Sequence, residues 1–187
     1  WYQWVISNPV FNVRLFVDNR SFAYSNLAAL INYAATASVA FLLSLYLQYA
    51  KNMSPQLAGL VLVIQPAIQT AFSPLAGRMS DRIEPRFIAS AGMALTALGL
   101  LLLTTLRVDT SMSYLAIALC CLGFGFALFC SPNVNAIMSS VSNEHYGIAS
   151  SSLATMRLLG QTMSLALATA IFSIMLGKEQ ISMANIE

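Results

Sequence analysis

The chain has 187 residues, a formal net charge of +2, and a composition that is 58% hydrophobic and only 9% charged. Soluble domains carry about 25% charged residues, so this composition excludes an ordinary water-soluble fold and indicates a membrane protein. The nine basic residues are scattered along the chain, which argues against a nucleic-acid-binding surface.

Residues 1–20 are predicted to form an interfacial lead-in to the first membrane span. Aromatic rings favour the lipid headgroup level and basic residues favour the cytoplasmic face. The segment offers both kinds of residue, in the order Trp1, Tyr2, Trp4, Arg14 and Arg20. It lacks the pattern of a secretory signal peptide and begins with Trp rather than Met, so we expect the natural N-terminus to lie elsewhere.

Five apolar stretches follow within residues 21–187, each close to the length that a helix needs to cross about 30 Å of hydrocarbon. They run from about Phe22 to Leu47, Leu57 to Ala76, Phe87 to Leu106, Tyr114 to Val141 and Ser151 to Leu176. Pro66 is expected to break the second stretch, and Pro132 with nearby glycines to kink the fourth. The sequence therefore predicts an all-α polytopic membrane protein with five transmembrane helices.

Basic residues alternate between the two sides of such a bundle. One side receives Arg14, Arg20, Arg78, Arg82 and Arg86, and the other receives Lys51, Arg107 and Lys178. Because cytoplasmic loops of membrane proteins are enriched in Lys and Arg, the first side is predicted to be cytoplasmic.

The loop from Gly77 to Arg86, with the sequence GRMSDRIEPR, lies between the second and third predicted spans. It resembles the G-x-x-x-D-R-x-G-R-[RK] signature loop of the major facilitator superfamily. The chain departs from that pattern at Glu84 and Pro85, where the superfamily loop usually has Gly before its later basic residues.

Three further segments extend the resemblance: NPVFNVRLFVDNRSFA before the first span, SPNVNAIMSSV closing the fourth, and LATMRLLGQ within the fifth. Together they resemble the fourteen-helix drug/proton antiporter subfamily. The resemblance implies that the five helices form most of the six-helix C-terminal half-bundle of a cell-membrane exporter. It further implies proton-coupled export of small amphipathic compounds by alternating access, without a cofactor and without enzymatic chemistry.

The signature loop also supports a conformational role by its own chemistry. Gly77 is suited to end a helix in a left-handed conformation, and Asp81 is placed to interact with the positive N-terminal end of the third span. Arg82 and Arg86 reach the same interface. Such charges can bridge helix ends in one conformation and release them in another. The alternative interpretation is a plain cytoplasmic anchor of positive charge.

Polar residues inside the spans are the candidates for a substrate cavity, because polar groups at membrane depth are costly unless they face a cavity or another helix. Gln65 and Gln69 share one face of the second span, and Pro66 between them frees backbone carbonyls. At each position an interhelical hydrogen bond is an equally good interpretation. The full candidate set is Asn32, Tyr33, Gln65, Gln69, Phe129, Asn133 and Gln161.

Arg157 is the basic residue that lies well inside an apolar stretch. It is interpreted either as a side chain that extends to the cytoplasmic interface or as part of a cytoplasmic gate. Cys120, Cys121 and Cys130 are interpreted as small buried hydrophobes, and His145 as a solvated loop residue. No metal site is predicted, because no His, Cys, Asp or Glu cluster has ligand spacing.

No Asp or Glu lies within a predicted span. An antiporter needs a group that changes its protonation state within the membrane, so the proton carrier is expected in the N-terminal half. The expected partners are then the lipid bilayer, a small-molecule substrate and protons. The competing hypothesis is a truncated membrane fragment, or a membrane assembly partner, that does not itself transport.

Overall fold

A computed structural model describes residues 13–176, and every regular element among them is a helix. In chain order these are α1 (Val13–Asp18), α2 (Arg20–Thr36), α3 (Val39–Leu45), η2 (Tyr46–Ala50), α4 (Pro55–Leu62), α5 (Ile64–Ser80), α6 (Pro85–Thr104), α7 (Met112–Ser139), η3 (Asn143–His145) and α8 (Tyr146–Leu176). Trp1, Tyr2, Trp4 and Lys178 lie outside the described residues.

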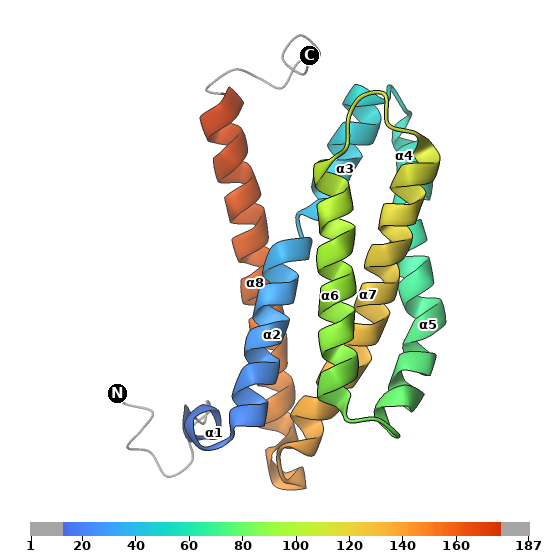
Figure 1. Ribbon diagram of the computed structural model, residues 1–187. Helices are drawn as coiled ribbons and strands as arrows, with labels where there is room; N and C mark the ends of the chain where they lie inside the picture. Colours follow the sequence, from blue (N-terminus) through green and yellow to red (C-terminus); the bar gives the residue numbers. More distant parts are fainter. Residues whose placement is uncertain (1–12, 177–187) are drawn as a thin grey trace.

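Five segments of the described chain are long and apolar enough to cross a membrane, which confirms the predicted all-α polytopic fold. They are Arg20–Ala50, Pro55–Ser80, Pro85–Thr104, Met112–Ser139 and Asn143–Ile174. Figure 1 shows them side by side, with α1 lying across one end of α2.

Several helices begin a few residues before the apolar stretch from which they were predicted, because a polar residue caps their first turn. The Asn19 side chain accepts a hydrogen bond from the Phe22 N–H at 3.0 Å, and Ser111 Oγ accepts one from the Tyr114 N–H at 3.3 Å. Pro85 begins α6, a position where its missing N–H costs nothing. The apolar pattern therefore marks the membrane-facing part of each helix, and the caps mark its end.

The first span is not one continuous helix: α2 ends at Thr36, and α3 begins at Val39 after a turn. The Ser38 N–H at this break donates to Ser164 Oγ of α8 at 3.0 Å, and Ser164 Oγ donates to Ser38 Oγ at 3.0 Å. A side chain of a neighbouring helix thus satisfies the freed backbone group, as lipid could not. Figure 1 shows α3 set aside from the line of α2.

The second span is broken, as predicted, but the break lies at Val63 rather than at Pro66. Because the ring of a proline crowds the carbonyl four residues earlier, Pro66 disturbs the helix at Leu62, where α4 ends. Pro132 behaves differently: it lies inside α7, which is assigned as a single helix from Met112 to Ser139.

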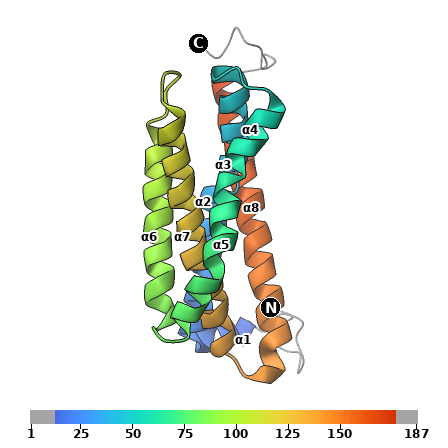
Figure 2. The ribbon, with the colours of Figure 1, turned by 90° about the vertical axis from the view of Figure 1, so that its right-hand side faces the viewer.

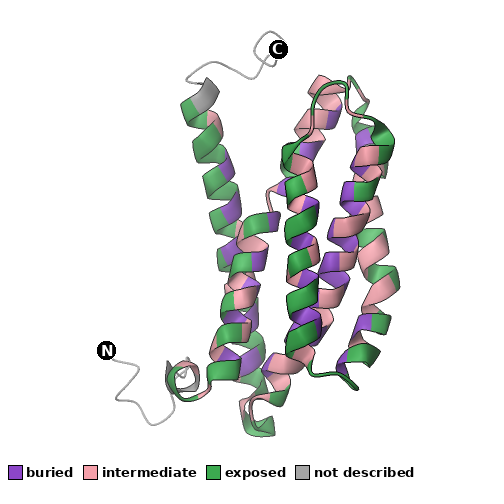
Figure 3. Ribbon diagram, viewed as in Figure 1, coloured by how far each residue is buried: buried purple, intermediate pink, exposed green. Residues whose placement is uncertain are grey.

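Helix α7 is the centre of the bundle. It packs against α6 and α5 on one side and against α2 on the other, while α8 packs along α2 (Figures 1 and 2). Half of the most apolar part of its span is buried, against at most 22% in the other four spans. Figure 3 shows largely exposed outer faces on α6 and α8, the arrangement expected when lipid covers them.

Glycines allow the closest helix contacts. A Cβ placed on Gly92 of α6 would lie 2.6 Å from the Phe129 backbone nitrogen of α7. A Cβ on Gly160 of α8 would lie 2.6 Å from the Leu30 carbonyl oxygen of α2. In lipid, small residues of this kind let helix backbones approach each other.

The loops at the two ends of the bundle allow a direct test of orientation. Ile83 lies exposed in the loop between α5 and α6, and Val108 lies exposed in the loop between α6 and α7. In a cysteine-free full-length protein, we expect a cysteine at position 108, but not at 83, to react with an impermeant thiol reagent on intact cells. Reaction at 83 alone would reverse the predicted topology.

Candidate polar site at membrane depth

Four helices bring polar side chains together in the interior of the bundle. Tyr33 of α2 lies with its hydroxyl oxygen 3.6 Å from the Cys130 sulfur of α7, and the Gln69 amide of α5 donates to the same sulfur at 3.9 Å. The Arg157 guanidinium of α8 lies 5.5 Å from the centre of the Tyr33 ring. We call these four residues the polar cluster.

The polar cluster unites three of the residues predicted for the cavity or the gate. Tyr33 is its centre, because it contacts both Cys130 and Arg157, and its ring also meets the ring of Phe126 edge-on at 6.1 Å. Aromatic rings attract cations to their faces, so Tyr33 holds the guanidinium inside the bundle. This contact agrees with the interpretation of Arg157 as part of a gate, which stays a prediction.

Arg157 also borders a cavity of about 520 Å³ between α7 and α8. The Nε atom of its guanidinium group is buried and has no hydrogen-bond partner among residues 13–176. Most of the cavity wall is apolar, and Gln161 and Ser150 supply its other polar side chains. The lining residues are Val134, Met138, Ser150, Leu153, Ala154, Arg157, Leu158 and Gln161.

The remaining cavity candidates do not join the polar cluster. Phe129 is 1% exposed and packs in the apolar core of the described residues, and its place in a substrate cavity stays a prediction. Asn32 and Asn133 are buried, and Asn32 Oδ1 has no hydrogen-bond partner in the described part of the chain. Gln65 is half-buried where α5 crosses α7 at Gly123.

The signature loop differs from the expected arrangement at Gly77. This glycine lies inside α5, which continues to Ser80, and it does not end the helix in a left-handed conformation. Its lack of a side chain serves packing instead, because a Cβ would lie 3.1 Å from Ser131 Oγ of α7. The predicted C-cap at Gly77 is therefore wrong.

The charges of the loop are exposed, and one ion pair forms among them. Arg86 pairs with Glu84 at 2.8 Å and stacks on the Phe87 ring at 4.9 Å. Asp81 and Arg82 are exposed and form no ion pair within residues 13–176. Asp81 and Arg82 are therefore the loop charges that could bind another part of the protein, as a switch would require.

Two polar contacts between helices were missed by the sequence reasoning. Asn135 of α7 donates to Ser80 Oγ at 2.6 Å, which ties the end of α5 to α7. Ser152 of α8 donates to Asn26 Oδ1 of α2 at 3.3 Å. Both partners are far apart in sequence, so no local pattern pointed to them.

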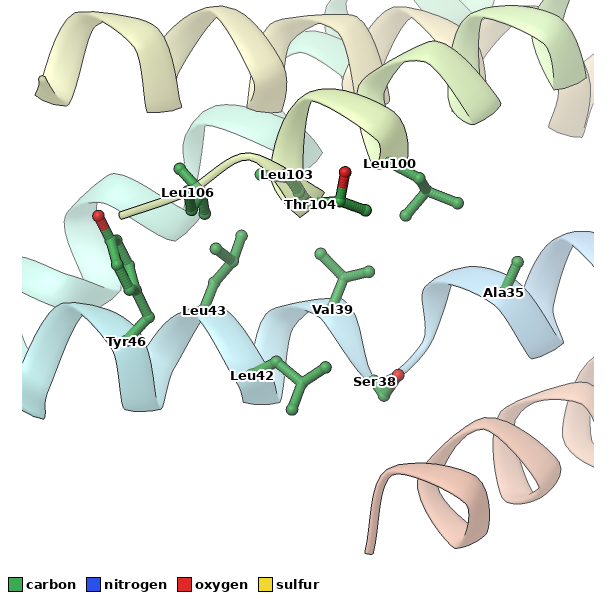
Figure 4. A pocket seen from close by; sticks show the side chains of 10 residues that line it. All are labelled: Ala35, Ser38, Val39, Leu42, Leu43, Tyr46, Leu100, Leu103, Thr104 and Leu106. Carbon is green, nitrogen blue, oxygen red and sulfur yellow. The ribbon is translucent and has the colours of Figure 1, made fainter. Parts of the chain in front are cut away.

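A second cavity, of about 440 Å³, lies between α3 and α6 (Figure 4). Leucine and valine side chains form most of its wall, and Tyr46 closes one end. It holds no charged side chain and lies apart from the polar cluster. This cavity therefore offers surface for lipid tails or for apolar side chains rather than for polar recognition.

Five helices that are long and apolar enough to span a membrane indicate an integral, multi-pass membrane protein. The chain belongs to the Major Facilitator Superfamily, whose characteristic sequence pattern matches residues 26–177. Membership assigns it to a family of membrane transporters rather than of enzymes.

Three relatives are identical to the chain at between 24% and 34% of the aligned residues. It is 34% identical over 83% of its length to the riboflavin transporter RibZ of Clostridioides difficile. It is 28% identical over 92% of its length to the multidrug resistance protein Stp of Mycobacterium tuberculosis. The lincomycin resistance protein LmrB of Listeria innocua is 24% identical over 92% of the chain.

The chain spans only a third of the length of these relatives: 33% of RibZ, 32% of Stp and 36% of LmrB. A five-helix segment of a longer transporter accounts for both the family match and this coverage.

Proposed function

We propose that the chain is most of the C-terminal half of a proton-coupled exporter of the fourteen-helix drug/proton antiporter type. The full-length protein exports small amphipathic compounds by alternating access. The observation that carries the proposal is the polar cluster beside a 520 Å³ cavity. Polar groups at membrane depth, lined up along a cavity, mark the path of a substrate in transporters.

The cavity wall supports an amphipathic substrate. Met138, Leu153 and Leu158 offer adaptable apolar surface, and Gln161 and Arg157 offer hydrogen-bond donors. Ligand sites of this size typically combine an apolar wall with a few polar groups that fix orientation. The names of Stp and LmrB, which are resistance proteins, support export as the direction of transport.

Protons are proposed to move through another part of the full-length protein. The acidic residues of the described chain, which are Asp18, Asp81, Glu84, Asp109 and Glu144, lie in loops or at helix ends. No carboxyl group is therefore available in the middle of these spans to carry a proton through the membrane.

The test is transport by the full-length protein in inside-out vesicles, with the fluorescent amphipathic cation ethidium as one probe and a fluorescent amphipathic anion as another. We expect a pH gradient, acidic inside, to drive uptake of at least one probe, and a protonophore to abolish it. Uptake that ignores the gradient would contradict proton coupling, and absence of uptake of either probe would count against multidrug export.

In the same vesicles, Asp81→Asn is expected to lower transport per molecule several-fold without lowering the amount of protein in the membrane. Asp81 is exposed and unpaired within the described chain, so its loss removes no internal contact. It would remove only a contact made in another conformation. Glu84→Gln is the matched control, because Glu84 pairs locally with Arg86. Equal transport by both variants would contradict the switch role.

A further inference from the structure

We infer that Arg157 binds an anionic group of the transported compound, a carboxylate above all, and that the transported class includes amphipathic anions. The inference rests on the proposed function, since it assigns a substrate class to the cavity of that transporter. It begins from the depth of the guanidinium, its lack of a counter-charge, and the shape of the cavity that it borders.

Arg157 lies deep in the bundle. It follows the start of α8, Tyr146, by eleven residues, which places its Cα about 16 Å along the helix. The guanidinium stays at this depth because it stacks on Tyr33, which lies inside the first span. A cation at such a depth is costly unless an anion compensates it.

The described chain provides no such anion. The ion pair within the described residues joins Arg86 to Glu84 at the end of the bundle, and every described acidic residue lies in a loop, in the short helix η3 or at a helix end. The guanidinium lies over the face of the Tyr33 ring, and the hydroxyl of that ring contacts the Cys130 thiol. The Nε donor is buried and unpaired within residues 13–176. No described carboxylate therefore balances the charge of the guanidinium at this depth.

The cavity beside Arg157 has room for that partner. Its volume of about 520 Å³ lies within the range of about 300–1,000 Å³ that small-molecule sites occupy. Met138, Leu153 and Leu158 are suited to an apolar body, while Arg157 is suited to a carboxylate, to which its planar guanidinium can donate two parallel hydrogen bonds. The matching ligand is a compound with one anionic group on an apolar frame.

The test uses the full-length protein in phosphatidylcholine nanodiscs and two probes of the same shape, 2-naphthoate and its neutral amide. We expect the wild type to bind naphthoate about tenfold or more tightly than the amide, as charge-assisted bonds to a buried guanidinium require. Arg157→Gln should abolish this preference, because it weakens the binding of naphthoate far more than that of the amide. Arg157→Lys should retain part of it, because Lys keeps the charge but not the paired donors.

Arg107→Gln is the control for a general loss of positive charge, because Arg107 lies in an exposed loop outside the cavity. It should leave the preference for naphthoate intact. Should Arg157→Gln fail to fold, the comparison of Arg157→Lys with wild type still decides the question.

Equal affinities of wild type and Arg157→Gln for naphthoate would overturn the inference. So would a gain in naphthoate affinity on mutation with a fall in thermal stability, because that result would show that a carboxylate of the protein itself occupies the guanidinium. The vesicle experiment separates the two proposals. Gradient-driven uptake without anion preference would refute only this inference, and anion binding without uptake would refute only the transport function.

Discussion

Gly92→Ala is expected to destabilise the full-length protein strongly and to reduce its yield in the membrane. The new Cβ would lie 2.6 Å from the Phe129 nitrogen and 2.8 Å from the Gly125 oxygen, and both atoms belong to the backbone of α7. A side chain could rotate away, but a helix backbone must move as a whole. We expect a cost of about 1–3 kcal/mol, typical of overpacking, measured as a lower midpoint of thermal unfolding in detergent.

Gly59→Ala is the control: it is the same substitution, but it is not expected to lower the stability of the protein. Gly59 lies inside α4, and nothing lies within 4 Å of its added Cβ. Alanine favours a helix over glycine by about 0.5–1 kcal/mol, so this variant should be as stable as the wild type or more stable. Equal midpoints for both variants would show that the α6–α7 contact is looser than the structure describes.

Ser164→Ala is expected to be the most damaging of the serine-to-alanine substitutions at the break in the first span. Ser164 Oγ is the acceptor for the Ser38 N–H, a backbone group freed where α2 gives way to α3. Its loss would leave that N–H unpaired at membrane depth, at a cost of about 1–3 kcal/mol. The expected results are a lower thermal midpoint and faster hydrogen exchange at the Ser38 amide.

Ser38→Ala separates the backbone bond from the side-chain bond. It removes the Oγ that accepts from Ser164 but leaves the position 38 N–H and its acceptor in place. Its effect should therefore be clearly smaller than that of Ser164→Ala. An equal or larger effect would mean that the hydroxyl pair, and not the backbone bond, holds the break against α8.

The sequence predicted the elements of the fold well because lipid imposes a simple rule on it. A helix that crosses hydrocarbon needs a long apolar run, and each of the five runs became a helix. The ends were less accurate: α8 begins at Tyr146, where a polar loop was expected to continue to Ser150. A polar residue such as Ser150 was expected in the loop, but inside a helix a serine hydroxyl can bond to backbone or to a neighbour, as Ser150 does with the Met138 sulfur of α7 at 4.0 Å.

The break between α2 and α3 could not be predicted from local sequence. It contains neither Pro nor Gly, and the serine that satisfies it lies 126 residues away. By contrast, Pro66 allowed the break in the second span to be predicted to within one turn, because a proline disturbs the turn that precedes it. Local rules thus located one interruption, and only tertiary contacts account for the other.

The polar cluster was predicted in part. Tyr33, Gln69 and Arg157 stood out because polar groups are rare in apolar runs. Cys130 did not, because a thiol in such a run usually behaves as a small hydrophobe. Phe129 could not be assigned from the sequence, because an aromatic ring suits a ligand wall and an apolar core equally well; the structure packs it in the core.

The position of Cys130 gives the unmodified protein a reporter of its own. Its sulfur lies between Tyr33 and Gln69, within the polar cluster that we propose to lie beside the transport path. The rate at which a small mercurial or maleimide reacts with this thiol, followed by mass spectrometry of the peptide that carries it, would track the opening of that path through a transport cycle. Binding of a ligand, closure of a gate and loss of the gradient would each change the reaction rate of this thiol, so no cysteine would have to be introduced.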